Sequence, residues 1–91
     1  MKDLPANVTR YNKTPVFTRA TVKKGLLRRH LTMAGTWGKI IILEGRLRYR
    51  ILEPEMEEIE LSPERYGVIE PGVPHEVEPI SHVRFYIEFF S

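Results

Sequence analysis

The sequence contains no cysteine in its 91 residues. Disulfide bonds, thiolate metal sites and cysteine nucleophiles are therefore excluded, and the chain fits a reducing compartment. No apolar run approaches the ~20 residues that cross a bilayer. The first five residues, Met1-Lys-Asp-Leu-Pro5, lack the apolar stretch of a signal peptide. We therefore expect a cytoplasmic protein with no membrane partner.

Several motifs of nucleotide-binding and hydrolytic enzymes are also missing. The chain has no glycine-rich phosphate loop, no nucleophile elbow and no convincing helical periodicity. Its length allows one domain with one modest core. We expect a single domain over residues 1–91, in which residues 1–12 form a polar N-terminal arm.

Charge is unevenly distributed, although the net charge is only +2. Residues 1–50 hold twelve Lys and Arg and two acidic residues, whereas residues 51–91 hold two Arg and ten Glu. One interpretation is a basic face for nucleic acid. We favour another, in which alternate arginines of segment 46–50 face alternate glutamates of segment 57–61 across a hairpin. We therefore expect no nucleic-acid partner.

Short stretches of alternating or β-branched residues, separated by turn residues, run through the chain. The expected strands are segments 14–18, 25–32, 36–44, 46–53, 57–61, 66–70, 75–78 and 83–90. Seven or eight short strands at regular spacing, with no helix among them, are typical of an all-β sandwich or closed barrel.

One turn fixes a histidine at the start of a strand. Pro71-Gly72 suits the centre of a type II turn, because proline presets φ and glycine accepts positive φ. Pro74 restricts the residue before it to extended geometry. His75 is therefore held rigidly, which makes it a candidate metal ligand or acid/base group.

His30 is the second histidine expected in the interior, whereas His82 is expected in an exposed turn. Two histidines from separate strands, with a nearby carboxylate, would form a site for a divalent metal such as Zn, Fe, Mn or Ni. Alternatively, each histidine only satisfies a hydrogen bond in the core.

Glu78 and Glu88 are the weaker candidates for the metal-binding carboxylate. Strand alternation puts Glu78 on the face opposite His75. For Glu88 we favour an ion pair with a basic residue such as Arg28 or Arg84 over a role as a ligand.

The turn before His75 resembles the second motif of the cupin superfamily, in which such a turn delivers a metal-binding histidine into a small β-barrel. Leu43-Glu-Gly45 resembles the end of the first cupin motif, where glycine closes a strand. The His-x-His pair of that motif is missing, and Gly38 stands near the position of its glutamate. The resemblance implies an all-β, cupin-like double-stranded β-helix, a small jelly-roll barrel, with an incomplete set of metal ligands.

A more specific resemblance covers residues 11–90. The matching runs are His30-Leu-Thr32, Gly35-Thr-Trp-Gly-Lys39, Leu43-Glu-Gly-Arg-Leu47, Glu70-Pro71 and His75-Glu-Val-Glu78. They resemble the TehB/YeaR-like cupin domains, which stand alone or precede the methyltransferase domain of a tellurite-resistance enzyme. The resemblance implies a cavity that holds His30 and His75. The chain has no SAM-binding signature, so methyl transfer is not implied.

Four further residues are candidates for lining the cavity or binding a ligand: Arg28, Thr32, Trp37 and Lys39. Core packing is as good an explanation of Trp37, and a solvated strand end is the better explanation of Lys39. Together with the histidines, Arg28 and Lys39 would suit an oxyanion.

Three functions remain open at this point. The first is a domain that binds a metal or small anion in a stress response such as tellurite tolerance, without methyltransferase activity. The second is a metal-dependent cupin-type enzyme of the oxygenase, isomerase or hydrolase class, which would need an open coordination position. The third is a non-catalytic module that forms a homodimer through its hydrophobic closing strand, Phe85–Phe90.

Overall fold

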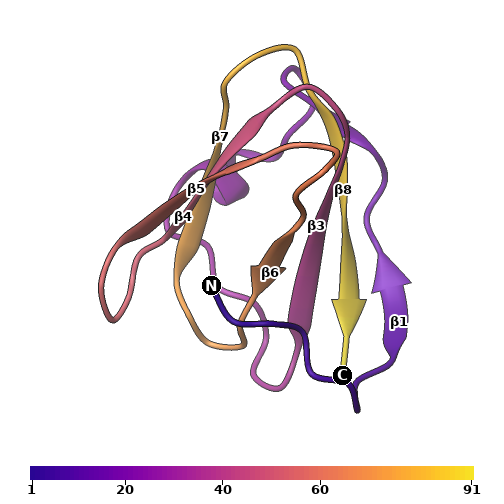
Figure 1. Ribbon diagram of the computed structural model, residues 1–91, viewed down its shortest axis with the longest axis vertical. Helices are drawn as coiled ribbons and strands as arrows, with labels where there is room; N and C mark the ends of the chain where they lie inside the picture. Colours follow the sequence, from indigo (N-terminus) through magenta and orange to yellow (C-terminus); the bar gives the residue numbers. More distant parts are fainter.

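Two antiparallel sheets pack against each other in the computed structural model, which describes residues 1–91 (Figure 1). The first sheet contains, in order, β1 (Arg10–Lys13), β8 (Arg84–Phe90), β3 (Trp37–Glu44) and β6 (Gly67–Ile69), and β2 (Phe17–Thr18) also pairs with β8. The second sheet contains β5 (Glu57–Leu61), β4 (Leu47–Ile51) and β7 (His75–Pro79). This two-sheet, all-β architecture confirms the expected cupin-like barrel.

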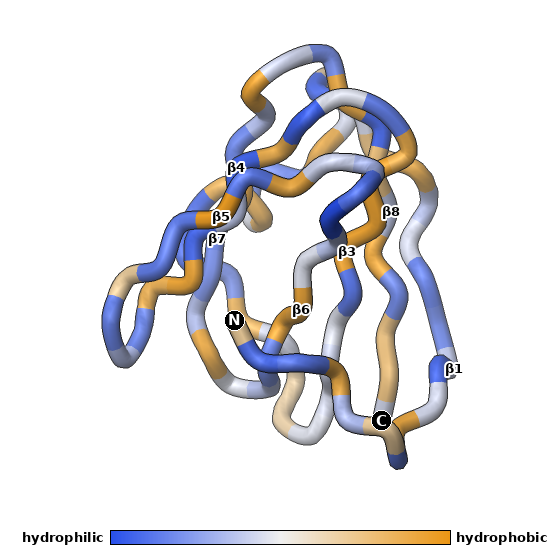
Figure 2. The backbone as a smooth tube through the Cα atoms, viewed as in Figure 1, coloured by the Kyte–Doolittle hydropathy of each residue, from blue (hydrophilic) through white to orange (hydrophobic).

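Alternate residues of the strands form the core between the sheets. Along β3, Gly38, Ile40 and Ile42 are buried, whereas the residues between them are more exposed. The tube in Figure 2 accordingly changes repeatedly between hydrophobic and hydrophilic colours along the strands. Because successive side chains of a strand point to opposite sides, this alternation assigns one face of each strand to the interior.

Segment 25–32 is not the strand that we expected. Residues Lys24–Leu27 form a short 3₁₀ helix, η1, and His30 makes only an isolated bridge with His75. Leu26 is buried, and its neighbour Leu27 also packs against the core. Two adjacent residues cannot both face the interior from one regular strand, so the hydrophobic packing favours a helical turn here.

One further expectation needs correction, and another stays a prediction. Residues 10–12, expected in an irregular arm, belong to β1, whose four residues are all exposed and so show no alternation in the sequence. The closing strand, β8, is paired with β3 on one side and with β1 and β2 on the other. Its backbone therefore offers no free edge to a second copy, and homodimer formation stays a prediction.

None of the helical segments has the length and apolar character of a membrane span.

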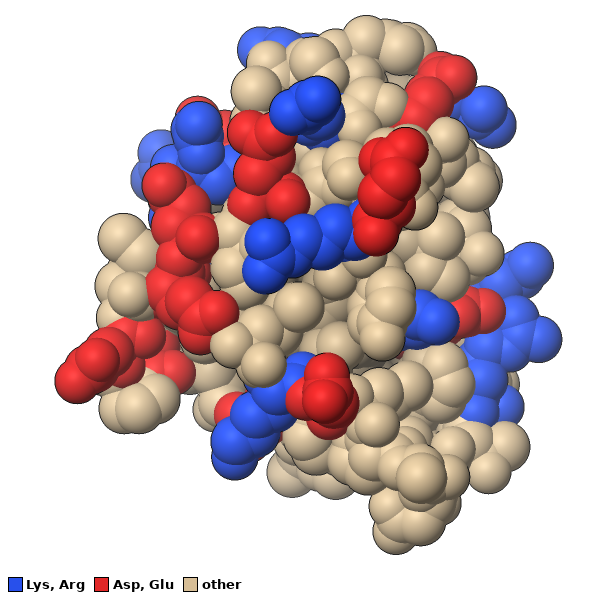
Figure 3. Space-filling view, viewed as in Figure 1, with Lys and Arg blue, Asp and Glu red and all other residues tan.

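The outer face of the second sheet carries a ladder of ion pairs. Arg48 lies opposite Glu60 and Glu78 on the two neighbouring strands, as the expected hairpin requires. The ion pairs are Arg46–Glu60, Arg48–Glu58, Arg48–Glu78, Arg50–Glu58, Arg50–Glu76 and Arg50–Glu78. Figure 3 shows acidic and basic side chains interspersed over the visible face. The basic and acidic halves of the sequence therefore pair with each other within this sheet.

Arg50 is the centre of this ladder, because it pairs with three carboxylates whereas Arg46 pairs with one. Hydrogen bonds from Arg50 and Arg48 hold the pKa of the Glu78 carboxyl below its ordinary value. We expect Arg50→Gln to lower the free energy of unfolding by no more than about 1 kcal/mol, because solvent screens exposed pairs, and Arg46→Gln to lower it less. Urea unfolding at about 0.05 M and about 1 M salt measures both, and the difference should shrink at high salt. If the loss of stability in Arg50→Gln were the same at both salt concentrations, it would be due to packing of the Arg50 stem and not to its charge.

Candidate functional site

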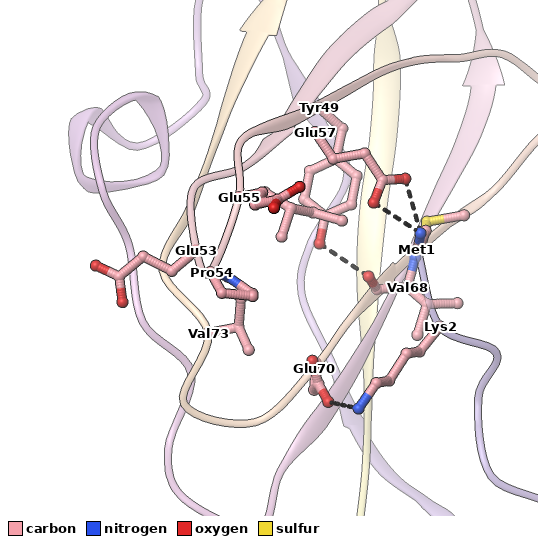
Figure 4. A pocket seen from close by; sticks show the side chains of 11 residues that line it. Met1, Lys2, Tyr49, Glu53, Pro54, Glu55, Glu57, Val68, Glu70 and Val73 are labelled. Carbon is pink, nitrogen blue, oxygen red and sulfur yellow. Dashed lines mark hydrogen bonds and ion pairs between the residues drawn. The ribbon is translucent and has the colours of Figure 1, made fainter.

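Two of the five cavities in the structure reach the fully buried side chains of His75 and Tyr49. The histidine cavity has a volume of about 250 Å³. It is lined by Thr14, Phe17, Lys23, Gly25, Leu26, His30, Thr32, Ile69, His75, Ile87 and Phe89. The glutamate cavity has a volume of about 310 Å³ and is lined by Met1, Lys2, Tyr49, Ile51, Glu53, Pro54, Glu55, Glu57, Val68, Glu70 and Val73 (Figure 4).

A type II turn positions His75, as the sequence predicted. Gly72 has a φ of 72°, and the Val73 N–H donates to the Glu70 carbonyl at 3.3 Å, which closes the turn. Pro74 is buried, and its carbonyl accepts from the Leu52 N–H at 2.9 Å. The side chain of His75 is then fixed on the inner face of β7, where the residue is 1% exposed.

A backbone bridge brings His30 to His75. The His30 N–H donates to the His75 carbonyl at 2.6 Å, and the His75 N–H donates to the His30 carbonyl at 2.9 Å. Arg29, directly before His30, has a φ of 30°, in a region that residues other than glycine rarely adopt. Strain of this kind is concentrated at functional sites.

The two imidazoles form a relay of hydrogen bonds. Nδ1 of His75 lies 3.1 Å from the Val73 carbonyl oxygen, which can only accept, so Nδ1 carries the proton. Nε2 of a neutral His75 must then accept, and it lies 3.3 Å from Nδ1 of His30, which donates. These assignments follow from the hydrogen-bond network. They leave Nε2 of His30 with a lone pair that has no partner in the protein.

Burial keeps both histidines neutral. It lowers the pKa of His75 below the ordinary 6.5; the hydrogen bond to Val73 opposes this shift, and His30 adds to it. Burial also lowers the pKa of His30. The site therefore presents a neutral hydrogen-bond acceptor near pH 7, and not a cation.

A cupin-type metal does not fit these residues. No group of three or more His, Cys, Asp or Glu side chains is placed to hold a metal ion. Gly38, which stands near the position of the cupin glutamate, lies against Ile69, and a Cβ at Gly38 would come within 2.9 Å of Cδ1 of Ile69. Ile69 therefore fills the space that a carboxylate ligand from β3 would need, and two hydrogen-bonded histidines are less than the three protein ligands usual in such sites.

The carboxylates named as weaker metal candidates lie elsewhere. Glu78 is on the outer face of β7 and pairs with Arg48 and Arg50. Glu88 forms an ion pair, as we expected, but its partner is Arg10, at 3.0 Å. The expectation for His82 is confirmed, because this side chain is exposed and lies 2.9 Å from Glu44.

Thr32 is the only one of the four further candidates that lines the histidine cavity. Its Oγ1 atom is buried and has no hydrogen-bond partner. An unpaired buried hydroxyl is costly, so Thr32 lowers the stability of the cavity wall.

Trp37, Lys39 and Arg28 are not brought to the histidines. Trp37 and Lys39 lie on the face of β3 opposite its buried residues, and the Lys39 Nζ atom is 4.5 Å from the centre of the Tyr66 ring. Arg28 is exposed and lines a separate surface groove. The oxyanion site expected from Arg28, Lys39 and the histidines is therefore not formed.

Sequence reasoning missed eight of the cavity residues. Five lie on or beside strands: Thr14, Phe17, Ile69, Ile87 and Phe89. The other three, Lys23, Gly25 and Leu26, come from the segment around η1. The available signal was the spacing of Val22, Leu26 and Leu27, which is helical and not alternating.

The glutamate cavity is closed by the first residues of the chain. Figure 4 shows Glu57 and Glu70 directed toward Met1 and Lys2, with which they form ion pairs at 2.7 Å each. Tyr49 lines this cavity, and its ring also lies 6.2 Å from that of His75. Tyr49 is therefore part of the wall between the two cavities. Burial raises the pKa of its phenol, and Glu57 adds to the shift.

Comparison with known proteins finds one family. The profile of the TehB-like domain matches residues 12–87. A probable S-adenosyl-L-methionine-dependent methyltransferase, TehB of Haemophilus influenzae strain ATCC 51907, is 32% identical over 75 residues, which are 78% of this chain and 26% of that protein. A second TehB sequence, from strain 10810, is 29% identical over the same length. The chain thus spans about a quarter of the curated relatives that it matches.

Solved structures show the same fold. The crystal structure of TehB from Haemophilus influenzae superposes with a TM-score of 0.86 and 28% identity, covering 93% of this chain and 32% of that one. A protein of Escherichia coli strain K12 superposes with a TM-score of 0.90 and 23% identity, covering 100% and 97%. The capsular polysaccharide assembling protein CapF of Staphylococcus aureus shares the fold more distantly, with a TM-score of 0.54 and 17% identity over 97% of this chain and 29% of that one.

Proposed function

Since this chain belongs to the family of TehB-like domains, we propose that it binds a small organic molecule in the histidine cavity. The observation that carries the proposal is the free lone pair on Nε2 of His30, a residue that lines this cavity. Thr32 also lines the cavity, but its Oγ1 atom is buried and so is closed to a ligand. A few placed polar groups in a mostly apolar cavity are typical of small-molecule sites.

The walls of the cavity favour binding over catalysis. No Asp, Glu, Cys, Ser or Tyr side chain lines it. His30 would accept a proton, but the two hydroxyls of the cavity, those of Thr14 and Thr32, form no hydrogen bond with His30, His75 or Lys23, so no activated nucleophile is present. The ligand that fits best is therefore one that donates a hydrogen bond to His30 and is released unchanged.

The match with TehB concerns one region of that protein. The region shared with TehB covers only 26% of that protein. We propose that this region supplies ligand binding to a pathway that includes a methyltransferase. A link to tellurite tolerance rests on the family resemblance.

A substitution at Gly25 tests the proposal. A Cβ at Gly25 would lie 4.0 Å from Cδ2 of His30, an ordinary contact, so a larger side chain enters the cavity without a backbone clash. We expect Gly25→Leu to weaken cavity ligands found by an NMR fragment screen by at least about tenfold, or about 1.4 kcal/mol. Lys24→Leu adds the same side chain at the exposed neighbouring position and should leave Kd unchanged.

Two results would contradict the proposal. The first is a set of fragments whose Kd is the same for Gly25→Leu and the wild type, or which shift only resonances of the glutamate cavity. The second is stoichiometric Zn, Fe, Mn or Ni in protein purified without an affinity tag and lost in His30→Ala, which would favour the metal hypothesis.

A further inference from the structure

The two cavities have opposite electrostatic character. Four glutamates line the glutamate cavity: Glu53, Glu55, Glu57 and Glu70. The histidine cavity has no acidic lining residue, and Lys23 is its only ordinarily charged residue. An organic cation would find no counter-charge in the histidine cavity, whereas an anion would find one.

Positive charge near this cavity is not neutralised by the protein. Lys23 forms no ion pair, and neither do its neighbours along the chain, Arg19, Lys24 and Arg28. All four are exposed. Lys23 therefore brings uncompensated positive charge to the cavity, whereas Arg19 and Arg28 line a separate groove. This contrasts with the paired arginines of the second sheet.

Resting on the proposed function, we propose that the ligand is a small organic anion with an apolar body and a hydroxyl group. Its carboxylate pairs with Lys23, where the charge stays in contact with water. Its apolar body contacts Phe17, Leu26 and Ile87, and its hydroxyl donates to Nε2 of His30.

The position of the charge follows from desolvation. A carboxylate placed among the apolar walls would lose its hydration without a cationic partner, at a cost of several kcal/mol. An inorganic oxyanion has no apolar part to contact those walls, so it would gain nothing from them. A molecule with its charge at one end satisfies both Lys23 and the apolar interior.

Matched acid and amide probes test the charge. The probes are 4-hydroxybenzoate with 4-hydroxybenzamide, and 2-hydroxy-4-methylpentanoate with its amide, titrated into the full chain and followed by NMR. We expect each acid to bind about tenfold more tightly than its amide, a difference of about 1.4 kcal/mol. Lys23→Met should weaken the binding of the acids about tenfold and leave the binding of the amides unchanged. Lys24→Met, at the next residue, should change the affinity for neither.

The outcomes separate this inference from the proposed function. Equal binding of acid and amide, both abolished by Gly25→Leu, would overturn the anionic ligand and leave the binding cavity in place. An equal loss of affinity for the acids in Lys23→Met and Lys24→Met would overturn the role of Lys23. Failure of all four probes to shift cavity resonances would overturn the ligand class, whereas the cavity itself is judged by the wider fragment screen.

Discussion

Replacement of Gly45 by alanine is expected to lower the free energy of unfolding by about 3–5 kcal/mol, near the upper end for a single substitution. Gly45 joins β3 to β4 with a φ of 81°, and a Cβ there would come within 1.8 Å of the carbonyl oxygen of His82. The obstacle is backbone, and it adjoins Val83, which is fully buried. The chain therefore cannot move aside without disturbing the core.

Gly35→Ala is the matched control for this prediction. Gly35 has the same φ of 81°, but no atom lies within 4 Å of the position of its Cβ. The Gly35→Ala substitution should lower the free energy of unfolding only by the strain of a positive φ, about 1 kcal/mol. Guanidinium chloride unfolding of both variants measures the cost of the clash as the difference between their free energies of unfolding. Equal losses of stability would show that the close approach of Gly45 to His82 does not destabilise the Gly45→Ala variant.

Acidification is expected to destabilise the fold well above the pH range in which carboxylates protonate. The folded pKa values of His75 and His30 lie below the ordinary 6.5, so the unfolded chain binds more protons as the pH falls below that value. The histidine contribution is therefore fully present above 6.5 and is lost as the pH falls toward the folded values. The slope can reach about 1.4 kcal/mol per pH unit for each proton, and the two imidazoles titrate as a pair.

Variants at each histidine identify the source of this slope. Urea unfolding between about pH 7.5 and about pH 5 should give a flatter pH dependence for His75→Gln and His30→Gln. His82→Gln, which removes an exposed histidine outside the cavity, is the matched surface control. Glu78 does not interfere, because its stabilising charge is lost only below its ordinary pKa of 4.5. A wild-type slope in both cavity variants would contradict the assignment of neutral, buried imidazoles.

The turn around His75 was predictable because its chemistry is local. Pro71 and Gly72 specify a type II turn by their own backbone preferences, and the structure closes that turn on Val73 as expected. The carbonyl of Val73 then fixes the tautomer of His75. The hydrogen bond that Nε2 of His75 then accepts was not predictable, since it depends on where the neighbouring imidazole of His30 lies.

The remainder of the site was less predictable because it depends on which side of a strand faces inward. The family pattern identified Trp37 and Lys39, but β3 buries Gly38 and Ile40, so both side chains point away from the cavity. A shift of one residue exchanges the two faces of a strand. Lys23 was missed for a different reason, because an exposed lysine carries no sequence signal that it borders a cavity.

The bridge between His30 and His75 has one more consequence, for the rate at which a ligand can reach the cavity. Its two bonds are the backbone–backbone hydrogen bonds that tie segment 23–35 to a strand of the barrel, and the Arg29 N–H adds a bond to the Glu76 side chain of the same strand. The bonds that align the imidazoles thus also fasten the segment that covers them, together with the packing of Leu26 and Leu27 against the core. Solvent exchange of the His30 amide would then report how often the cavity opens, and a ligand held beneath the segment would slow that exchange.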